Sequence, residues 1–498
     1  FGSLDVLVIG DAMLDCYLAG AAGELCREAP VPIVKVTERV AMPGGAANTA
    51  LNVRSLGARV TLLSAIGDDA EGRRLHSILA ERDVATEHVL MRPDRQTLAK
   101  NRVLAAEQLL VRFDQGSTSA VDQAAERALI ERMAVLFPRC AAVIVSDYGY
   151  GILTPRIIAA LAMLQARCPR IVVADSKDLA AFRAVGLTAA KPNYAECLRL
   201  LGASAGEDRA TRAEWIAGRG AQLLDITGAR MVATTLDAEG AIIVEREGPP
   251  YRTYARPTRD TNAAGAGDTF LSALALALAA GADTPAAAEI AAAAATVVVG
   301  KPGTATCATA ELRGAFAGES KYATDLARLI ARVEEYRRQG CRIVFTNGCF
   351  DILHRGHITY LNRAKALGDI LIVGMNTDDS VRRLKGLQRP INSLEDRAQV
   401  LAALSCVDEL IAFDDETPIR LIRALRPDVF VKGGDYTRAS LPEAPVVEQL
   451  GGRVEILPYL HHRSTTNLIE RIRLVPAVGE LHEQPADFGR ELERTVGS

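Results

Sequence analysis

Short apolar runs alternate along the chain with longer segments in which apolar residues recur at helical spacing. The runs include VLVIG at 6–10, AVIVSD at 142–147, IVVAD at 171–175, MVATTL at 231–236, RIVFT at 342–346 and ILIVGMN at 370–376. Strands that alternate with helices predict parallel sheets with helices on both faces. Strands that are apolar almost throughout fit a sheet that is buried on both sides. The expected fold class is therefore α/β.

The alternation is interrupted at residues 311–340, which are polar, helical in period and poor in strand-forming residues. A chain of 498 residues is expected to hold more than one domain, so we place a boundary there. The predicted organisation is a first domain at 1–315, a helical linker at 316–340, a second domain at 341–475 and a tail at 476–498. The tail has few apolar residues, which is typical of disorder.

Composition and charge argue against several classes of protein. The net charge of −3 disfavours nucleic-acid binding, which normally requires a basic surface. The nine cysteines form no CxxC pair, so we expect reduced thiols in a cytoplasmic protein rather than a zinc ribbon or a disulfide framework. The first ten residues lack the basic and apolar segments of a secretory signal. The apolar run at 270–282 is too short to span a bilayer, so no membrane partner is expected.

The clearest candidate site of the first domain is DTNAAGAGDTFLSALALALAAG at 260–281. The backbone N–H groups of Gly265, Ala266 and Gly267 would form an anion site at the start of the long apolar helix, and glycine lets phosphate approach closely. Asp268 follows at once and could act as the general base that takes a proton from a sugar hydroxyl. The alternative is a helix N-cap after a flexible turn. There is no GxxxxGK[ST] sequence, so this is not a P-loop.

Other polar residues of the first domain follow strands or tight turns. Asp11 and Asp15 come just after the first strand, at the end where α/β sheets hold ligands. Asn48 follows the Gly44–Gly45 turn in MPGGAANTALNV. KPNYAE at 191–196 offers Asn193 and Glu196 as hard oxygen ligands for Mg²⁺, and TTLDAEGAIIV at 234–244 is predicted as strand, turn and strand around Gly240, at the edge of a nucleotide pocket.

The order GDxxxD, PGGAAN, SDYG, NxxE and GAGD resembles that of the ribokinase-type carbohydrate kinases, over about residues 1–310. The resemblance implies a doubly wound sheet with a small β lid, ATP, Mg²⁺, a monovalent cation and a homodimer formed through the lid. It implies a sugar site at Asp15, Gly44, Gly45 and Asn48, an ATP and metal site at Asn193, Glu196, Thr235 and Gly240, an anion hole at Gly265, Ala266 and Gly267, and Asp268 as the base. Where that family tends to SDYxKG, this chain has Tyr150 in place of the lysine.

The second domain opens with TNGCFDILHRGHITYL at 346–361, in which His354 and His357 are three residues apart. A helix is predicted to begin near Gly356, so both histidines lie at its entrance and on one side. Zinc needs three or four protein ligands, and neither HExxH nor a nearby cysteine or acidic cluster supplies them. Two readings then remain open: unrelated surface histidines, or a pair of donors directed at the phosphates of a nucleotide.

Three later segments favour the phosphate reading. RRLKGLQRP at 382–390 supplies Lys385 and Arg389, and VKGGDY at 431–436 supplies Lys432 and Asp435. HRSTTNLIERI at 462–472 places hydroxyl groups at a helix entrance, where they suit a triphosphate. These hydroxyl residues are Ser464, Thr465 and Thr466.

Together these motifs resemble the HxGH nucleotidyltransferases of the glycerol-3-phosphate cytidylyltransferase type, over 341–473. The resemblance implies a Rossmann-like domain in which a sugar or polyol phosphate attacks the α-phosphate of a nucleoside triphosphate and pyrophosphate leaves. It assigns catalysis to His354, His357 and Lys385, nucleotide binding to Asn347, Gly348, Phe350, Arg389, Lys432, Ser464, Thr465 and Thr466, and sugar binding to Asp351 and Asp435.

The two halves in one chain resemble the bifunctional heptose kinase/adenylyltransferases, which share EAPVPIVKV, LKGLQRPIN, VKGGDY and STTNLI in character. That resemblance implies phosphorylation of D-glycero-D-manno-heptose 7-phosphate at its anomeric hydroxyl and adenylyl transfer to heptose 1-phosphate. A separate phosphatase must act in between. Two alternatives stay open: a cytidylyltransferase for another sugar or polyol phosphate, and a kinase half that has become a sugar-phosphate sensor.

Overall fold

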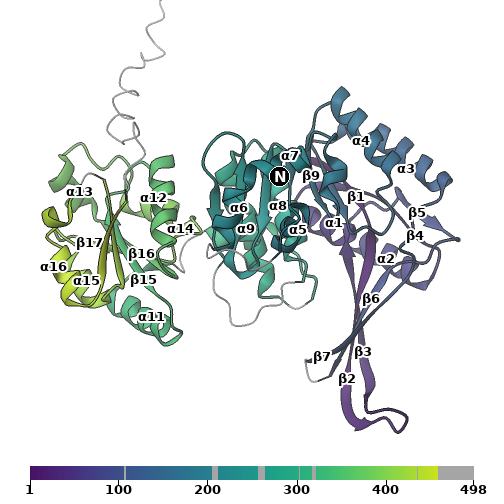
Figure 1. Cartoon of the computed structure of the whole chain (residues 1–498), viewed down its shortest axis with the longest axis horizontal. Helices are drawn as coiled ribbons and strands as arrows, with labels where there is room; N and C mark the ends of the chain where they lie inside the picture. Colours follow the sequence, from purple (N-terminus) through teal and green to yellow (C-terminus); the bar gives the residue numbers. More distant parts are fainter. Residues whose placement is uncertain are drawn as a thin grey trace, which may run out of the picture. The chain divides into compact units, whose positions relative to one another are not determined.

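The computed structural model describes residues 1–105, 108–204, 211–255, 264–301, 303–316, 321–434 and 436–457 (Figure 1). The chain divides into two compact units. The first unit comprises Phe1–Tyr322 and Ala398–Leu410, and the second comprises Ala323–Arg397 and Ile411–Ser498. The tail predicted at 476–498 lies outside the described residues.

A nine-stranded sheet forms the centre of the first unit, in the order β13-β12-β11-β10-β9-β8-β1-β4-β5. The strands are β1 (Asp5–Gly10), β4 (Arg59–Gly67), β5 (Val89–Arg92), β8 (Ala142–Asp147), β9 (Ile171–Ser176), β10 (Ala189–Ala190), β11 (Met231–Thr235), β12 (Ala241–Glu245) and β13 (Tyr251–Thr253). Neighbours pair in parallel except β11 with β12 and β12 with β13. The apolar runs predicted at 6–10, 142–147, 171–175 and 231–236 are β1, β8, β9 and β11.

Helices cover both faces of this sheet, as the alternation along β1 requires. Val6 and Val8 belong to one apolar core, and Leu7 and Ile9 belong to the other, because successive strand side chains point to opposite faces. The helices that contribute to the first core are α1 (Ala46–Ser55), α2 (Ala70–Glu81), α8 (Ala266–Ala279), α9 (Thr284–Val299) and α10 (Thr309–Phe316). Those that contribute to the second are α3 (Gln123–Leu136), α4 (Pro155–Arg167), α5 (Tyr194–Leu200), α6 (Arg212–Gly218) and α7 (Gly220–Thr227).

A four-stranded lid projects from the first unit (Figure 1). Its strands, in the order β3-β2-β6-β7, are β2 (Ala12–Leu25), β3 (Pro32–Gly45), β6 (Ala99–Ala105) and β7 (Gln108–Gln115). The base of the lid is joined directly to the nine-stranded sheet and its helices, because β2 begins two residues after β1 ends and α1 begins directly after β3. The lid is therefore attached at the carboxyl end of β1, where the sequence predicted a ligand site.

The second unit is built on a six-stranded sheet in the order β14-β17-β16-β15-β18-β19. The strands are β14 (Tyr322–Ala323), β15 (Ile343–Gly348), β16 (Ile370–Asn376), β17 (Glu409–Phe413), β18 (Val429–Gly433) and β19 (Arg453–Leu457). The helices are α11 (Leu326–Arg338), α12 (Arg355–Lys365), α13 (Asp378–Lys385), α15 (Ile419–Leu425) and α16 (Ala444–Gln449), together with the first residues of α14 (Leu394–Ala402), whose remaining residues are assigned to the first unit. The predicted linker helix corresponds to α11, and its Leu329 and Val333 lie in the apolar core of this unit.

Two further features bear on the sequence expectations. All nine cysteines are free thiols. Within the described ranges, a helix with the length and apolar character needed to cross a bilayer is not found.

Candidate active sites

Asp268 lies at the centre of a buried cluster in the first unit. It is in the first turn of α8, and only 5% of its surface is exposed. One carboxylate oxygen accepts a hydrogen bond from Nδ2 of Asn48 at 2.8 Å, and the other accepts one from the Tyr148 hydroxyl at 2.9 Å. Burial raises the pKa of Asp268 to about 6, and both donors counteract part of that rise. The group is therefore mostly ionised at neutral pH, as a general base must be.

The start of α8 has the geometry of an anion site. Gly265 precedes the helix with φ of 84°, and a Cβ there would lie 2.9 Å from Nδ2 of Asn48, so both conformation and space require glycine. A Cβ on Gly267 would lie 3.5 Å from Nζ of Lys191, which places this ammonium beside the predicted anion hole. Lys191 is buried and forms an ion pair with Asp175 at 2.8 Å. The sequence analysis missed this lysine, although it begins the quoted KPNYAE.

Asp11 fixes the loop that carries Tyr148. Its carboxylate accepts backbone hydrogen bonds from Tyr148 at 2.8 Å, Tyr150 at 3.1 Å and Ile152 at 3.2 Å. Burial raises the pKa of Asp11, and these three donors oppose that effect. Asp11 is thus a positioning residue, because it holds the loop whose tyrosine contacts Asp268.

The predicted sugar residues meet at the base of the lid. Asp15 on β2 forms an ion pair with Arg102 on β6. A Cβ at Gly44 would lie 2.4 Å from Oδ2 of Asp15, so glycine allows β3 to pass close to this carboxylate. Gly45 is the residue that precedes α1, and Asn48 lies in the first turn of that helix. The structure therefore brings these residues into the region between the lid and Asp268.

The predicted magnesium residues form a helix cap. Oδ1 of Asn193 accepts the N–H of Glu196 at 2.9 Å, and Oε2 of Glu196 accepts the N–H of Asn193 at 2.9 Å. Oε1 of Glu196 accepts from Lys177 at 2.6 Å. Burial tends to raise the pKa of Glu196, but these donors outweigh it and the pKa lies below its ordinary value. Among the described residues, no three or more histidine, cysteine, aspartate or glutamate side chains are grouped to hold a metal ion.

The predicted edge of the nucleotide pocket lies beside this cap. Thr235, at the end of β11, forms an isolated parallel bridge with Asn193, and its N–H donates to the carbonyl of Pro192 at 3.0 Å. Gly240 follows the short helix Asp237–Glu239 and precedes β12, with φ of 91°. The strand, turn and strand expected around Gly240 are thus present.

The two histidines of the second unit are in contact at the start of α12. His354 is the N-cap residue, and its Nδ1 accepts the N–H of Gly356 at 3.1 Å. The imidazole rings of His354 and His357 lie 4.0 Å apart, and the Phe350 ring packs edge-on against His357 at 5.7 Å. Burial, followed by the neighbouring His354, lowers the pKa of His357 to about 4. His357 is therefore neutral at pH 7, and its buried Nδ1 has no hydrogen-bond partner among the described residues.

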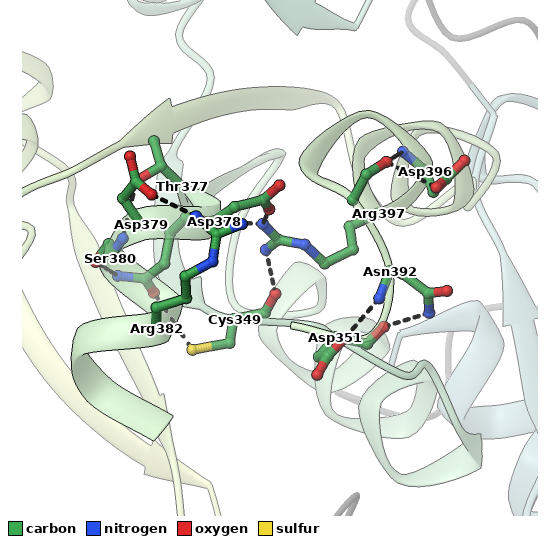
Figure 2. Close-up of polar contacts among 12 residues, drawn as sticks. Cys349, Asp351, Thr377, Asp378, Asp379, Ser380, Arg382, Asn392, Asp396 and Arg397 are labelled. Atoms are coloured by element: carbon green, nitrogen blue, oxygen red, sulfur yellow. Dashed lines mark hydrogen bonds and ion pairs between the residues drawn. The ribbon is translucent and has the colours of Figure 1, made fainter. Parts of the chain in front are cut away.

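Asp351 anchors a loop beside the histidines. Its carboxylate accepts hydrogen bonds from Nε of Arg389 and from the backbone N–H groups of Ile391 at 2.7 Å and Asn392 at 3.0 Å. Asn392 also donates from its side chain to the Asp351 carbonyl at 2.6 Å (Figure 2). The predicted sugar residue Asp351 and the predicted phosphate residue Arg389 are thus paired with each other.

The fully buried Arg397 is a second residue that the sequence analysis missed. Its guanidinium donates to the carbonyls of Cys349 and Asn376 and forms an ion pair with Asp378 at 2.7 Å (Figure 2). Cys349 lies in the histidine motif, so Arg397 links that motif to the end of β16 and the start of α13. Nothing in the sequence pattern shows whether an arginine at this position of the helix is buried or exposed.

The remaining predicted nucleotide residues surround the carboxyl ends of β15 and β18. Nζ of Lys432 donates to Oδ1 of Asn347 at 2.8 Å and lies 3.4 Å from the buried Glu443. Gly348 ends β15, and Lys385 is the exposed last residue of α13, close enough to lower the pKa of the Cys349 thiol, which burial raises. The other predicted residues, Asp435, Ser464, Thr465 and Thr466, lie outside the described residues.

Comparisons with known families match both units. The pfkB family carbohydrate kinase model matches residues 3–311, and the cytidylyltransferase-like model matches residues 345–471. The chain is thus a carbohydrate kinase fused to a nucleotidyltransferase, which confirms the two enzyme classes predicted from the motifs.

Full-length relatives define the family more closely. The bifunctional protein HldE of Geobacter sulfurreducens is 40% identical, with 96% of this chain and 97% of the relative covered. That of Azotobacter vinelandii is 41% identical, with 96% and 98% covered. The chain belongs to the HldE family of bifunctional proteins, which confirms the predicted resemblance to the bifunctional heptose enzymes.

Solved structures support the fold of the first unit. Escherichia coli phosphofructokinase-2 in complex with potassium has a TM-score of 0.53 at 20% identity, with 62% of this chain and 97% of that chain covered. Arabidopsis thaliana ribokinase complexed with ribose and ATP has a TM-score of 0.51 at 18% identity, with 62% and 98% covered. These likenesses confirm the ribokinase-like α/β fold.

Proposed function

We propose that this chain carries out two steps of ADP-heptose synthesis. The first unit transfers the γ-phosphate of ATP to the anomeric hydroxyl of D-glycero-D-manno-heptose 7-phosphate, giving the 1,7-bisphosphate and ADP. The second joins the AMP moiety of ATP to heptose 1-phosphate, giving ADP-heptose and pyrophosphate. The observation that carries the kinase assignment is the buried, ionisable Asp268 at the start of α8, held by Asn48 and Tyr148.

In the kinase step, Asp268 takes the proton of the anomeric hydroxyl as its oxygen attacks the γ-phosphorus. The bond to the β-phosphate oxygen breaks, and ADP leaves. Backbone N–H groups at 265–267 and the ammonium of Lys191 would stabilise the charge on the transferred group. Asp15, Asn48 and the Gly44–Gly45 turn would hold the sugar in line for attack.

Magnesium is expected to accompany ATP in the kinase site. The residues fit this ion in charge and hardness, because Glu196 stays ionised beside Asn193. Glu196 and Asn193 would hold the ion, and the hydrogen bonds from Lys177 and from the Asn193 N–H keep the Glu196 carboxylate in place. When bound, the ion would neutralise phosphate charge. The family resemblance also implies a monovalent cation, which a potassium titration would test.

In the adenylyl transfer step, an oxygen of the sugar 1-phosphate attacks the α-phosphorus and pyrophosphate leaves. No covalent enzyme intermediate forms, so catalysis depends on positioning and charge stabilisation. Nδ1 of His357 has no hydrogen-bond partner within the described part of the chain, which supports a role in phosphate binding, because a buried polar atom normally has a partner. Lys385, Lys432 and the backbone at the start of α12 supply further donors.

Several partners follow from this proposal. The 7-phosphate must be removed between the two steps, so a separate bisphosphate phosphatase is required. A homodimer through the lid is supported by large apolar side chains that are exposed there, because patches of this kind usually mark an interface. They are Leu25, Val31, Ile33, Val36, Leu109, Val111 and Phe113. A cytoplasmic location is proposed because ATP is the substrate and the nine thiols are free.

One experiment separates this function from its alternatives. The protein is incubated with heptose 7-phosphate and ATP, and mass spectrometry is used to detect the bisphosphate. Heptose 1-phosphate is then supplied with either ATP or CTP, and pyrophosphate is measured. Bisphosphate formation and turnover with ATP are expected. Turnover with CTP alone would instead identify a cytidylyltransferase, and the absence of bisphosphate would favour a sensor role for the kinase half.

A further inference from the structure

Lys100 belongs to a row of charged side chains on one face of the lid. The strand register places it directly beside Asp15 on β2 and Asp114 on β7. Two residues further along β6, Arg102 lies between Tyr17 and Arg112. Because strand side chains alternate between faces, these two rows share one face of the lid sheet.

The two arginines of this face are already paired with carboxylates. Arg102 pairs with Asp15, and Arg112 donates two hydrogen bonds to Asp114, at 2.9 and 2.6 Å. Within the described part of the chain, the Lys100 ammonium forms neither a hydrogen bond nor an ion pair. It lies instead over the stacked rings of Tyr148 and Tyr150, 5.0 and 5.3 Å from their centroids.

This environment leaves the ammonium short of anionic partners. Lys100 is half-buried, and burial lowers its pKa although Asp15 counteracts the effect. Cation–π contacts with two tyrosines offset only part of the lost hydration. An anionic ligand group would supply the hydrogen bonds and the charge that the protein does not.

The position of Lys100 indicates which end of the substrate it meets. The Lys100 ammonium lies 5.0 Å from the centroid of the Tyr148 ring, and the Tyr148 hydroxyl donates to the Asp268 carboxylate, so Lys100 and the base contact different parts of one residue. The transferred phosphate is assigned to the start of α8, where Lys191 lies. A sugar whose reacting hydroxyl meets Asp268 would extend its far end towards the lid and Lys100.

We infer that Lys100 binds the phosphate group that the sugar already carries, and thereby makes the kinase selective for a sugar phosphate over the free sugar. This inference rests on the proposed kinase function. Lys100 is a specificity-determining residue that contacts the substrate away from the reacting atoms. Its charge distinguishes a phosphorylated from an unphosphorylated sugar of otherwise identical structure.

The test compares two sugars and two lysine variants in the full-length protein. Lys100→Met keeps the apolar stem and removes the charge. Lys35→Met is the control, because Lys35 lies on β3 of the same lid, is exposed and is 3.9 Å from Glu24. With heptose 7-phosphate, Lys100→Met is expected to raise KM about 10- to 100-fold, the range for losing a hydrogen bond to a charged group. With unphosphorylated heptose, kcat/KM should stay unchanged, and Lys35→Met should match the wild type with both sugars.

Two results would overturn the inference. An equal loss on both sugars would assign Lys100 to phosphoryl transfer or to folding, and an unchanged KM would exclude contact with the substrate. A calorimetric titration of heptose 7-phosphate without ATP tests the site separately from turnover. If the wild type binds this sugar phosphate and Lys100→Met binds it no more weakly, the inference fails. If the wild type phosphorylates neither sugar, the proposed kinase function fails instead, whatever the titration gives for Lys100.

Discussion

At the scale of single residues, burial and hydrogen bonding set the protonation states of both candidate sites. Burial raises the pKa of Asp268 to about 6 and lowers that of His357 to about 4, so at pH 7 the first is mostly a carboxylate and the second is a neutral imidazole. The sequence indicated which residues these are. It could not indicate their protonation states, because the donors to Asp268 come from positions 48 and 148, brought together only by the fold.

The kinase should lose activity as the pH falls through about 6, because protonated Asp268 cannot accept the sugar proton. Tyr148→Phe removes a hydrogen bond that favours the carboxylate, so the pKa of Asp268 should rise and the midpoint should move to higher pH. The measurement is kcat/KM of the kinase step against pH. Adenylyl transfer by the same variant is the control. A midpoint that stays in place would contradict the role given to Tyr148.

Asp268→Asn tests the base itself. The substitution preserves the shape of a fully packed side chain but cannot accept a proton, so kcat for the kinase step should fall by about 10²- to 10⁴-fold. Pyrophosphate release by the second unit should be unaffected, which shows that the protein is folded. If phosphate transfer persists at the wild-type rate, the assignment of Asp268 as the base is wrong.

His357→Ala is expected to abolish pyrophosphate release while the kinase step survives. Because the pKa of His357 is about 4, kcat/KM for adenylyl transfer should show no loss between pH 5 and 8 that is due to this residue. A pH profile of the wild type, with His76→Ala as a control histidine variant in the first unit, checks this. An imidazole NMR signal of the wild type that titrates near the ordinary histidine pKa and is missing from the spectrum of His357→Ala would contradict the neutral state.

At the scale of elements, the sequence predicted the strands and helices better than the side-chain contacts between them. Apolar runs located the buried strands, because burial on both faces leaves little choice of residue. The histidine motif located the start of α12 to within one residue. Lys100 could not be found in this way, since its neighbours depend on the register between β2, β6 and β7. Arg397 was equally hidden, because α14 alone does not reveal which side is covered.

Arg397→Leu should destabilise the second unit by about 3–5 kcal/mol, because it leaves Asp378 and the carbonyls of Cys349 and Asn376 without their donor. The only tryptophan, Trp215, lies in the first unit and reports on that unit alone. In urea, circular dichroism of Arg397→Leu should show that the second unit unfolds at a lower urea concentration than in the wild type. Tryptophan fluorescence, which reports on the first unit, should not change at that concentration.

Arg382→Leu is the matched control for this experiment. Arg382 is exposed and pairs with Asp379 three residues away on α13, so its loss should change stability by at most about 1 kcal/mol. Equal effects of the two substitutions would show that the buried network around Arg397 contributes no more than a surface ion pair.

At the scale of the whole molecule, the lid sheet has one charged face and one apolar face, because side chains alternate along its strands. Lys100, Arg102 and Asp114 lie on one face, while Val111 and Phe113 point to the other. The charged face is the one that contacts Tyr148 and Tyr150. In the proposed dimer, a second copy of the chain would therefore pack on the apolar face without obstructing the proposed sugar site.

Substitution of the apolar face should accordingly dissociate the proposed dimer. Val111 and Phe113 are 51% and 42% exposed, and aspartate at both positions would place charge where the second copy is expected to pack. The wild type should have the mass of two chains by light scattering, and the double variant Val111→Asp, Phe113→Asp the mass of one. Val135→Asp is the control, because Val135 is 57% exposed on α3, away from the lid. A double variant that retains the mass of two chains would place the dimer interface elsewhere on the protein.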